Sequence, residues 1–218
     1  MDTRATFWLI AGPNGAGKTT SLSSARVRRL VEGVPFLNAD DVTLEKIKMA
    51  GWSGFASVSG SELKHYFVEA ADEVFSAVWK AISDGKSIGT ETVLSTSKFQ
   101  KVVDLVKEVG GAFGFVYVGL ASPELSAERV ARRVANGGHD VPADRLVARW
   151  NRSVQNMGWY AAQADAFFVF DNSNSDPDVP PVLIAEGGGG RAVIHEADAI
   201  PAITESLLAA FGGEPQVP

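Results

Sequence analysis

The chain has 218 residues, no cysteine, 45% apolar residues and a net charge of −6 at pH 7. The length fits one domain, and the apolar fraction suffices for a buried core. The lack of cysteine excludes disulfides and thiolate sites and suits a cytoplasmic protein. The acidic balance leaves no broad basic surface for nucleic acid or an anionic membrane, so we expect neither as a partner.

The most informative motif lies near the N-terminus. The apolar run 6–11 predicts a buried strand, and residues 12–19 (GPNGAGKT) behind it match the phosphate-loop pattern G-x-x-x-x-G-K-[ST] at every fixed position. Glycines let the backbone N–H groups wrap phosphates, Lys18 supplies positive charge, and Thr19 offers a hydroxyl to Mg²⁺. A helix expected from Lys18 to Glu32 points its positive end at the same anion. The residues expected to bind ATP are Gly12, Pro13, Asn14, Gly15, Ala16, Gly17, Lys18, Thr19 and Thr20.

Strand and helix patterns then alternate along the chain. Strands are expected over 34–38, 87–90, 112–120 and 167–171, and helices over 61–83, 99–106, 123–136 and 142–164. This alternation implies a parallel sheet covered by helices on both faces, with ligands at the carboxyl ends of the strands. Beyond a turn-rich segment, the pattern of 181–212 predicts a glycine-rich β-hairpin and a final helix.

Carboxylates follow two of the expected strands. Phosphoryl transfer to a hydroxyl needs a carboxylate near the γ-phosphate that orients the acceptor. Of the pair after the second strand, we expect Asp41 to cap a helix beginning near Thr43 and Asp40 to act as the base. Glu91 and Thr92, after the third strand, are expected to bind acceptor hydroxyls or a water of the Mg²⁺ shell, unless they cap the next helix.

Positive charge gathers in the segment expected to form a lid, about 123–164, which has six arginines and no lysine. Arginine gives planar, bidentate recognition of phosphate oxygens. Two helices joined by a hinge at Gly137-Gly138 could therefore close on a triphosphate, and we expect Arg133 and Arg149 to contact it. The alternative for each arginine is surface pairing with an acidic neighbour. Those neighbours are Glu124, Glu128, Asp140 and Asp144.

A phosphate loop alone does not separate a kinase from other nucleotide-binding proteins. Asp171 ends the fifth strand as a second Mg²⁺-binding aspartate would, but Asn172 and Ser173 follow it in place of a glutamate that could polarise water. An ATPase or switch therefore stays open as an alternative. A second open alternative is a protein without catalytic activity, whose lid changes its contact with a partner protein when ATP is bound.

Taken together, these motifs resemble the zeta toxin kinases, specifically the compact predicted ATPases near that group. The resemblance covers residues 6 to 173, which is most of the chain. It rests on GPNGAGKTT, on LNADD at 37–41, on GTETVLST at 89–96, on the arginine-rich run 129–153 and on FVFDNS at 168–173.

The resemblance implies a P-loop NTPase of the adenylate-kinase-like α/β class. With the length and patterns above, we expect one domain over 1–218, with an arginine-rich lid at about 123–164 and a C-terminal hairpin and helix at about 181–212. It implies Asp40 as the base, Glu91 and Thr92 at the acceptor, and Arg133 and Arg149 on the transferring phosphate. The implied reaction uses ATP and Mg²⁺ to phosphorylate a nucleotide conjugate, either the amino sugar of UDP-N-acetylglucosamine or the adenosine ribose of NAD. The implied protein partner is a small antitoxin.

Overall fold

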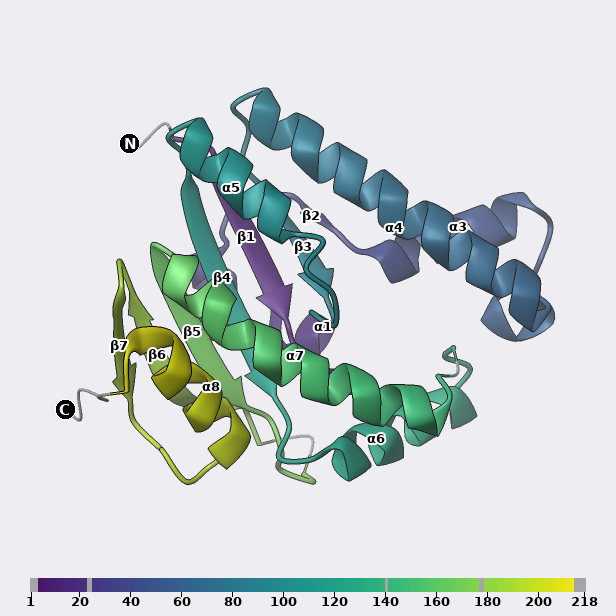
Figure 1. Ribbon diagram of the computed structural model, residues 1–218. Coiled ribbons are helices and arrows are strands. Elements are labelled where there is room, and N and C mark those ends of the chain that lie inside the picture. Colours follow the sequence, from purple (N-terminus) through teal and green to yellow (C-terminus); the bar gives the residue numbers. More distant parts are fainter. Residues whose placement is uncertain (1–3, 23–24, 140, 177–178, 214–218) are drawn as a thin grey trace.

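The apolar runs of the sequence form one seven-stranded sheet in the order β2-β3-β1-β4-β5-β6-β7 (Figure 1). The computed structural model describes residues 4–22, 25–139, 141–176 and 179–213. Strands β1 to β5 are mutually parallel, whereas β6 and β7 are antiparallel additions at one edge. The strands are β1 (Thr6–Ala11), β2 (Phe36–Leu37), β3 (Ile88–Thr92), β4 (Ala112–Gly119), β5 (Ala166–Asp171), β6 (Val182–Gly188) and β7 (Arg191–Ile194).

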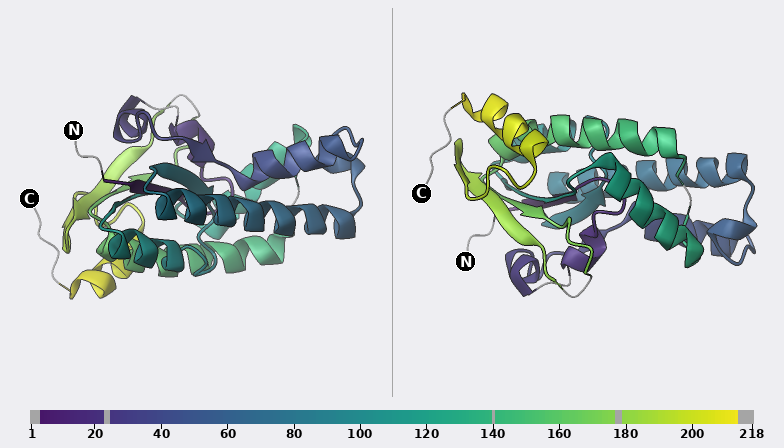
Figure 2. Two further views of the ribbon diagram at one scale, coloured as in Figure 1. Left: turned by 90° about the horizontal axis from the view of Figure 1, so that it is seen from above. Right: turned by 90° about the horizontal axis from the view of Figure 1, so that it is seen from below.

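Helices cover both faces of the sheet, as the sequence predicts (Figure 2). The described helices are α1 (Lys18–Leu22), α2 (Ala25–Leu30), α3 (Ala39–Met49), the 3-10 turn η1 (Phe55–Ser57), α4 (Gly60–Ser83), α5 (Gln100–Glu108), α6 (Pro123–Ala135), α7 (Ala143–Gln163) and α8 (Pro201–Phe211). Side chains of β1 alternate between the faces: Phe7 and Leu9 join the core under α4, α5, α7 and α8, whereas Trp8 and Ile10 pack with Val27 of α2. No helix within the described ranges is long and apolar enough to cross a membrane.

The strand register brings the phosphate loop and the predicted carboxylates to one edge of the sheet. The last residue of β1, Ala11, pairs with Thr92 of β3, and Leu37 of β2 pairs with Thr90. Because parallel strands end at the same edge, the segments that follow β1, β2 and β3 emerge together. This is the arrangement that the alternating pattern predicts.

One local prediction was wrong. Helix α3 begins at Ala39, four residues before Thr43, because the Asn38 side chain accepts a hydrogen bond of 2.8 Å from the Asp40 N–H. Asn38 is therefore the cap, and Asp41 lies inside the first turn. The helix expected over 18–32 is described as α1 and α2, and the residues between them, 23–24, lie outside the described residues.

The lid and the C-terminal elements match the prediction more closely. Helix α6 ends in a Schellman motif, in which Gly137 has a φ of +88° and the Gly138 N–H bonds to the Arg133 carbonyl at 3.0 Å. The chain then turns back into α7. At the other end of α7, Gly158 lies so close to α8 that a Cβ atom would meet the Ser206 carbonyl oxygen at 2.3 Å. The C-terminal helix is thus fixed against the lid's second helix.

The contact at Gly158 predicts a stability effect. Alanine favours helix over glycine by about 1 kcal/mol, but forcing α8 away from α7 should cost more, so Gly158→Ala should destabilise the protein by roughly 1–2 kcal/mol. Gly60→Ala is the matched control, since Gly60 is also helical and no atom lies within 4 Å of its added Cβ. Urea unfolding measures both. Equal stabilities of the Gly158 and Gly60 variants would contradict this packing.

Candidate functional site

The phosphate loop is held by close contacts with the ends of two strands. Gly12 has a φ of +148°, and a Cβ there would lie 2.2 Å from the Val118 carbonyl oxygen of β4. Asn172, just after β5, donates its side-chain N–H to the Ala16 carbonyl at 2.8 Å, and a Cβ on Gly17 would meet that nitrogen at 2.7 Å. These positions therefore require glycine for close approach as well as for backbone conformation.

The lid begins directly at this loop. The buried Ser126 hydroxyl on α6 donates to the Asn14 carbonyl at 2.6 Å. A Cβ on Gly15 would lie 3.0 Å from the Cβ of Arg129, one turn further along α6. The first turns of α6 and the phosphate loop thus form one rigid unit, and Ser126 and Asn172 are positioning residues that the sequence did not reveal.

Lys18 is a partly buried cation of the site. Its ammonium group donates to the carbonyls of Gly12 at 2.9 Å and Pro13 at 3.2 Å. Burial lowers the pKa of Lys18 to about 8, although Glu91 and Asp40 act to raise it. Lys18 therefore lies within electrostatic reach of carboxylates from both β3 and α3.

Glu91 faces the phosphate loop, as predicted. Its carboxylate accepts a hydrogen bond of 3.1 Å from the Thr19 hydroxyl. Burial raises the pKa of Glu91, while Lys18 and the Thr19 bond oppose that effect. The alternative that Glu91 caps the next helix is wrong, because α5 begins after Phe99 with no side-chain cap. Thr92 instead accepts from the Leu94 N–H at 3.2 Å and so stabilises its own turn.

A hydroxyl beside a carboxylate suits Mg²⁺, which commonly takes one or two protein oxygens and completes its shell with water and phosphate. Thr19 and Glu91 provide such a pair. Within the described ranges no group of three or more acidic or histidine side chains could hold a metal ion by itself. The donor set therefore fits a metal that arrives with a nucleotide.

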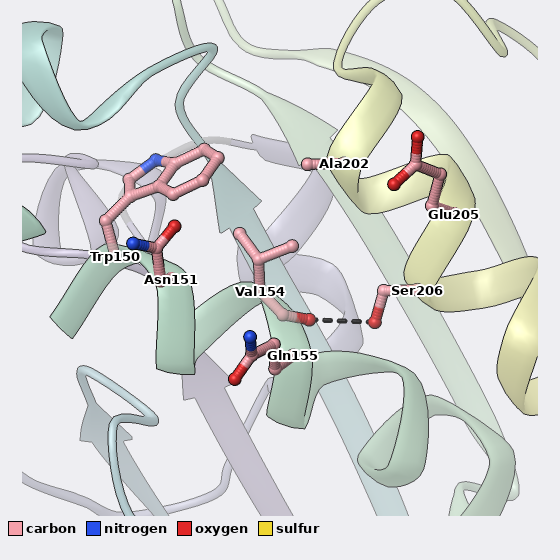
Figure 3. A pocket seen from close by; sticks show the side chains of 7 residues that line it. All are labelled: Trp150, Asn151, Val154, Gln155, Ala202, Glu205 and Ser206. Carbon is pink, nitrogen blue, oxygen red and sulfur yellow. Dashed lines mark hydrogen bonds between the residues drawn. The ribbon is translucent and has the colours of Figure 1, made fainter. Parts of the chain in front are cut away.

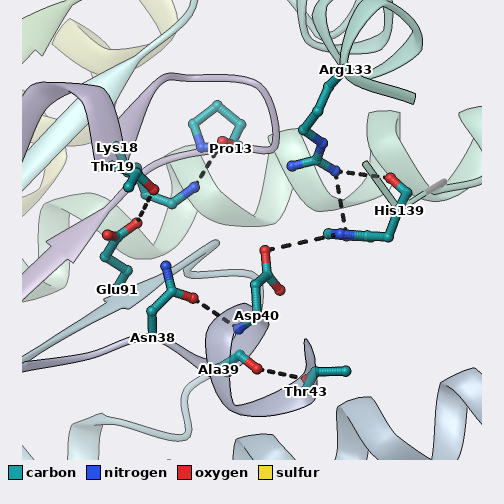
Figure 4. Close-up of polar contacts among 10 residues, drawn as sticks. All are labelled: Pro13, Lys18, Thr19, Asn38, Ala39, Asp40, Thr43, Glu91, Arg133 and His139. Atoms are coloured by element: carbon teal, nitrogen blue, oxygen red, sulfur yellow. Dashed lines mark hydrogen bonds and ion pairs between the residues drawn. The ribbon is translucent and has the colours of Figure 1, made fainter. Parts of the chain in front are cut away.

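Asp40 lies across the site from the lid, in the first turn of α3. Its side chain is about half exposed, and one carboxylate oxygen lies 4.0 Å from Nδ1 of His139. Figure 4 shows Arg133 of α6 reaching the same histidine, with Nη2 3.1 Å from its carbonyl oxygen and 3.4 Å from its Nε2. Arg133 Nε is buried and has no hydrogen-bond partner among the described residues. Arg133 also acts to lower the pKa of Lys18, so it stands close to the phosphate loop.

Of the other arginines in the lid, some lie on the surface and others lie near the site. Arg132 pairs with Glu128 at 2.8 Å on the surface, as the alternative reading of the sequence predicted. Arg129 and Arg152 donate to backbone carbonyls of other segments. Partial burial lowers the pKa of Arg149, neighbouring arginines lower it further, and Asp40 opposes them. Asp140, another predicted partner, lies outside the described residues.

Asp171 is hydrogen-bonded within the turn that follows β5. Its carboxylate accepts hydrogen bonds from the backbone N–H and the hydroxyl of Ser173, which closes the turn after β5. The Thr19 hydroxyl contacts Glu91 instead. The carboxylate beside the phosphate loop is thus supplied by β3.

A separate hollow of about 330 Å³ lies between α7 and α8 (Figure 3). Its lining residues are Trp150, Asn151, Val154, Gln155, Ala202, Glu205 and Ser206. Ser206 donates its hydroxyl to the Val154 carbonyl there, which ties the two helices together. None of the lining residues belongs to the phosphate loop or to the charged groups around it, so this hollow is not part of the site.

Residues 2–176 match the family model of the zeta toxins. The chain belongs to the zeta toxin family. No curated protein matches it significantly. The solved structure of the AvrRxo1-ORF1:-ORF2 complex with ATP is similar, with a TM-score of 0.69 and 17% identity over 92% of this chain. A structure from the PezAT chromosomal toxin-antitoxin system of Streptococcus pneumoniae has a TM-score of 0.58 and 14% identity, covering 98% of this chain and 81% of that one.

These structural likenesses establish the fold, which is the α/β architecture of the P-loop kinases. The chain spans 64% of the length of the AvrRxo1 chain that it matches. The zeta toxin match ends before β6, so the C-terminal hairpin and α8 lie beyond it.

The burial of Lys18 predicts proton uptake on nucleotide binding. A triphosphate beside Lys18 should return its pKa from about 8 toward its ordinary 10.5 or above. At about pH 9, between these values, binding should take up close to one proton. Calorimetry in buffers of different ionisation enthalpy measures this uptake. Lys18→Arg is the control, since arginine stays charged; equal uptake by the two proteins would contradict the assignment.

Proposed function

We propose that the chain transfers the γ-phosphate of ATP to a hydroxyl group of a nucleotide conjugate. The observation that carries this proposal is the convergence of charges on Lys18, whose pKa responds to Glu91, Asp40 and Arg133 from three different elements. Phosphoryl transfer needs this combination: cations on the departing and transferring oxygens and a carboxylate for the acceptor. An ATPase would need a group that orients water, and Asn172 and Ser173 follow β5 in place of a glutamate that could do so.

In the proposed reaction Asp40 accepts the proton of the acceptor hydroxyl as its oxygen bonds to the γ-phosphorus. The bond from that phosphorus to the bridging oxygen breaks, and ADP leaves. Lys18 and Arg133 stabilise charge on the phosphate oxygens, with Arg149 approaching from α7. Thr19 and Glu91 would hold Mg²⁺, which supplies neutralisation of the β- and γ-phosphate charge.

We propose UDP-N-acetylglucosamine or the adenosine ribose of NAD as the acceptor. Both carry sugar hydroxyls that a carboxylate such as Asp40 can bind and deprotonate. Glu91 and Thr92 were predicted to bind acceptor hydroxyls or a water of the Mg²⁺ shell. The Thr19 contact of Glu91 and the turn contact of Thr92 favour an indirect role for this pair, through Mg²⁺ and through the shape of the loop.

We also propose that the protein is a toxin held in check by a small antitoxin. The support is family membership together with the similar structures, one from a system described as toxin-antitoxin and the other a two-protein complex.

The direct test is mass spectrometry of a metabolite extract incubated with ATP and the pure protein. A kinase leaves a product heavier by one phosphoryl group, and addition of pure UDP-N-acetylglucosamine or NAD then identifies the acceptor. Lys18→Ala is the control for contaminating activity. ADP and free phosphate without a phosphorylated acceptor would contradict the proposal and favour the ATPase, and ATP binding without turnover would favour the binding module.

The proposed base predicts a selective loss in Asp40→Asn. The amide keeps the shape of the side chain but cannot accept the proton, so turnover should fall by roughly two orders of magnitude or more while ATP affinity persists. Asp41→Asn is the matched control in the same helical turn. Steady-state kinetics with the identified acceptor measure both variants. Greater damage from Asp41→Asn would mean that the two carboxylates have the opposite roles.

The lid arginines predict a second selective loss. Arg133→Lys and Arg149→Lys should lower turnover more than they weaken ATP binding, because a point charge cannot reproduce a bidentate contact that strengthens during transfer. The neighbouring Arg132→Lys should behave as wild type, since Arg132 pairs with Glu128 on the surface. Loss of ATP affinity alone in the Arg133 variant would show that this arginine only binds the nucleotide.

A further inference from the structure

His139, at the junction of α6 and α7, connects the lid to the opposite side of the site. Its ring lies 5.5 Å from the ring of Phe55 in η1 and 4.8 Å from that of Phe67 in α4, centroid to centroid. The two phenylalanine rings are themselves stacked, 5.8 Å apart and 5° from parallel. With its side chain only 10% exposed, His139 packs against both aromatic rings.

The two ring nitrogens of His139 face different functional groups. Arg133 Nη2 lies 3.4 Å from Nε2, and a guanidinium group only donates hydrogen bonds. Nε2 must therefore accept, which leaves the proton on Nδ1. That nitrogen is the one 4.0 Å from the Asp40 carboxylate (Figure 4). The gap exceeds a hydrogen bond by about 1 Å, so a small approach of the lid would complete the contact.

We propose that His139 is a positioning residue that couples lid closure to the orientation of Asp40. As Arg133 moves toward the phosphate, the histidine ring moves with it, and its Nδ1–H binds one oxygen of Asp40. The other oxygen is then directed at the acceptor hydroxyl. This inference rests on the proposed function, because it assigns His139 a task in the same transfer.

The geometry itself can be tested without any acceptor. Long-range ¹H–¹⁵N NMR spectra of the full chain at about pH 8 report which nitrogen of each histidine carries a proton. His65→Phe and His195→Phe assign the two other histidine signals. We expect the proton of His139 on Nδ1. A proton on Nε2, in the neutral or the charged ring, would overturn the proposal.

The coupling is tested by kinetics of His139→Phe, which keeps an aromatic ring against Phe55 and Phe67 but removes both nitrogens. We expect an unchanged melting temperature, an ATP Kd and an acceptor KM within about twofold of wild type, and a kcat lower by roughly tenfold to a hundredfold, the scale for lost positioning. His139→Ala should lose stability as well. His65→Phe, on the exposed face of α4, is the control.

The outcomes separate this inference from the proposed function. If His139→Phe has the wild-type kcat while His139→Ala does not, the histidine only packs and the inference fails. If wild-type protein transfers phosphate to no acceptor although the Nδ1 proton is found, the proposed function fails and the contact between lid and Asp40 still stands.

Discussion

The partly buried ammonium group of Lys18 is the charge around which the polar side chains at the carboxyl edge of the sheet are arranged. Taking a lysine out of water is costly unless anionic groups surround it. Two backbone carbonyls and the carboxylates of Glu91 and Asp40 supply that negative potential. Because these groups come from the phosphate loop, β3 and α3, the strand order β2-β3-β1 is what brings them together. The sheet topology is therefore the origin of the site's electrostatics.

The lid is anchored at one end and docks at the other. Ser126 ties the start of α6 to the phosphate loop, whereas His139, just beyond the end of α6, packs on aromatic rings of η1 and α4. Between these two points lies Arg133, whose aliphatic stem passes so close to Gly138 that a Cβ there would meet its Cγ at 2.7 Å. Contacts at both ends of α6 therefore limit where the guanidinium group of Arg133 can lie, and stabilisation of developing charge requires such placement.

Features that depend on local sequence were predictable. The phosphate loop, the parallel strands and the amphipathic helices follow from residue patterns within one element, and Glu91 followed from its place at a strand end. The prediction that Asp41 caps the helix was wrong. Asn38, an equally favourable cap residue, lies three residues earlier and caps α3 instead. Contacts such as that of Asn172 with Ala16 join residues 156 positions apart, so no local pattern signals them. Similarly, Arg132 and Arg133 are adjacent in sequence, and only their contacts in the structure show that Arg132 pairs with Glu128 on the surface while Arg133 reaches His139.

A crystal structure with Mg²⁺ and a non-hydrolysable ATP analogue tests the central claim most directly. The account predicts that Lys18 and Arg133 both lie within hydrogen-bond distance of phosphate oxygens, that Thr19 and Glu91 face the metal, and that the Asp40 carboxylate points toward the γ-phosphate. A nucleotide bound with Arg133 turned to solvent, or with Asp40 directed away from the γ-phosphate, would contradict it.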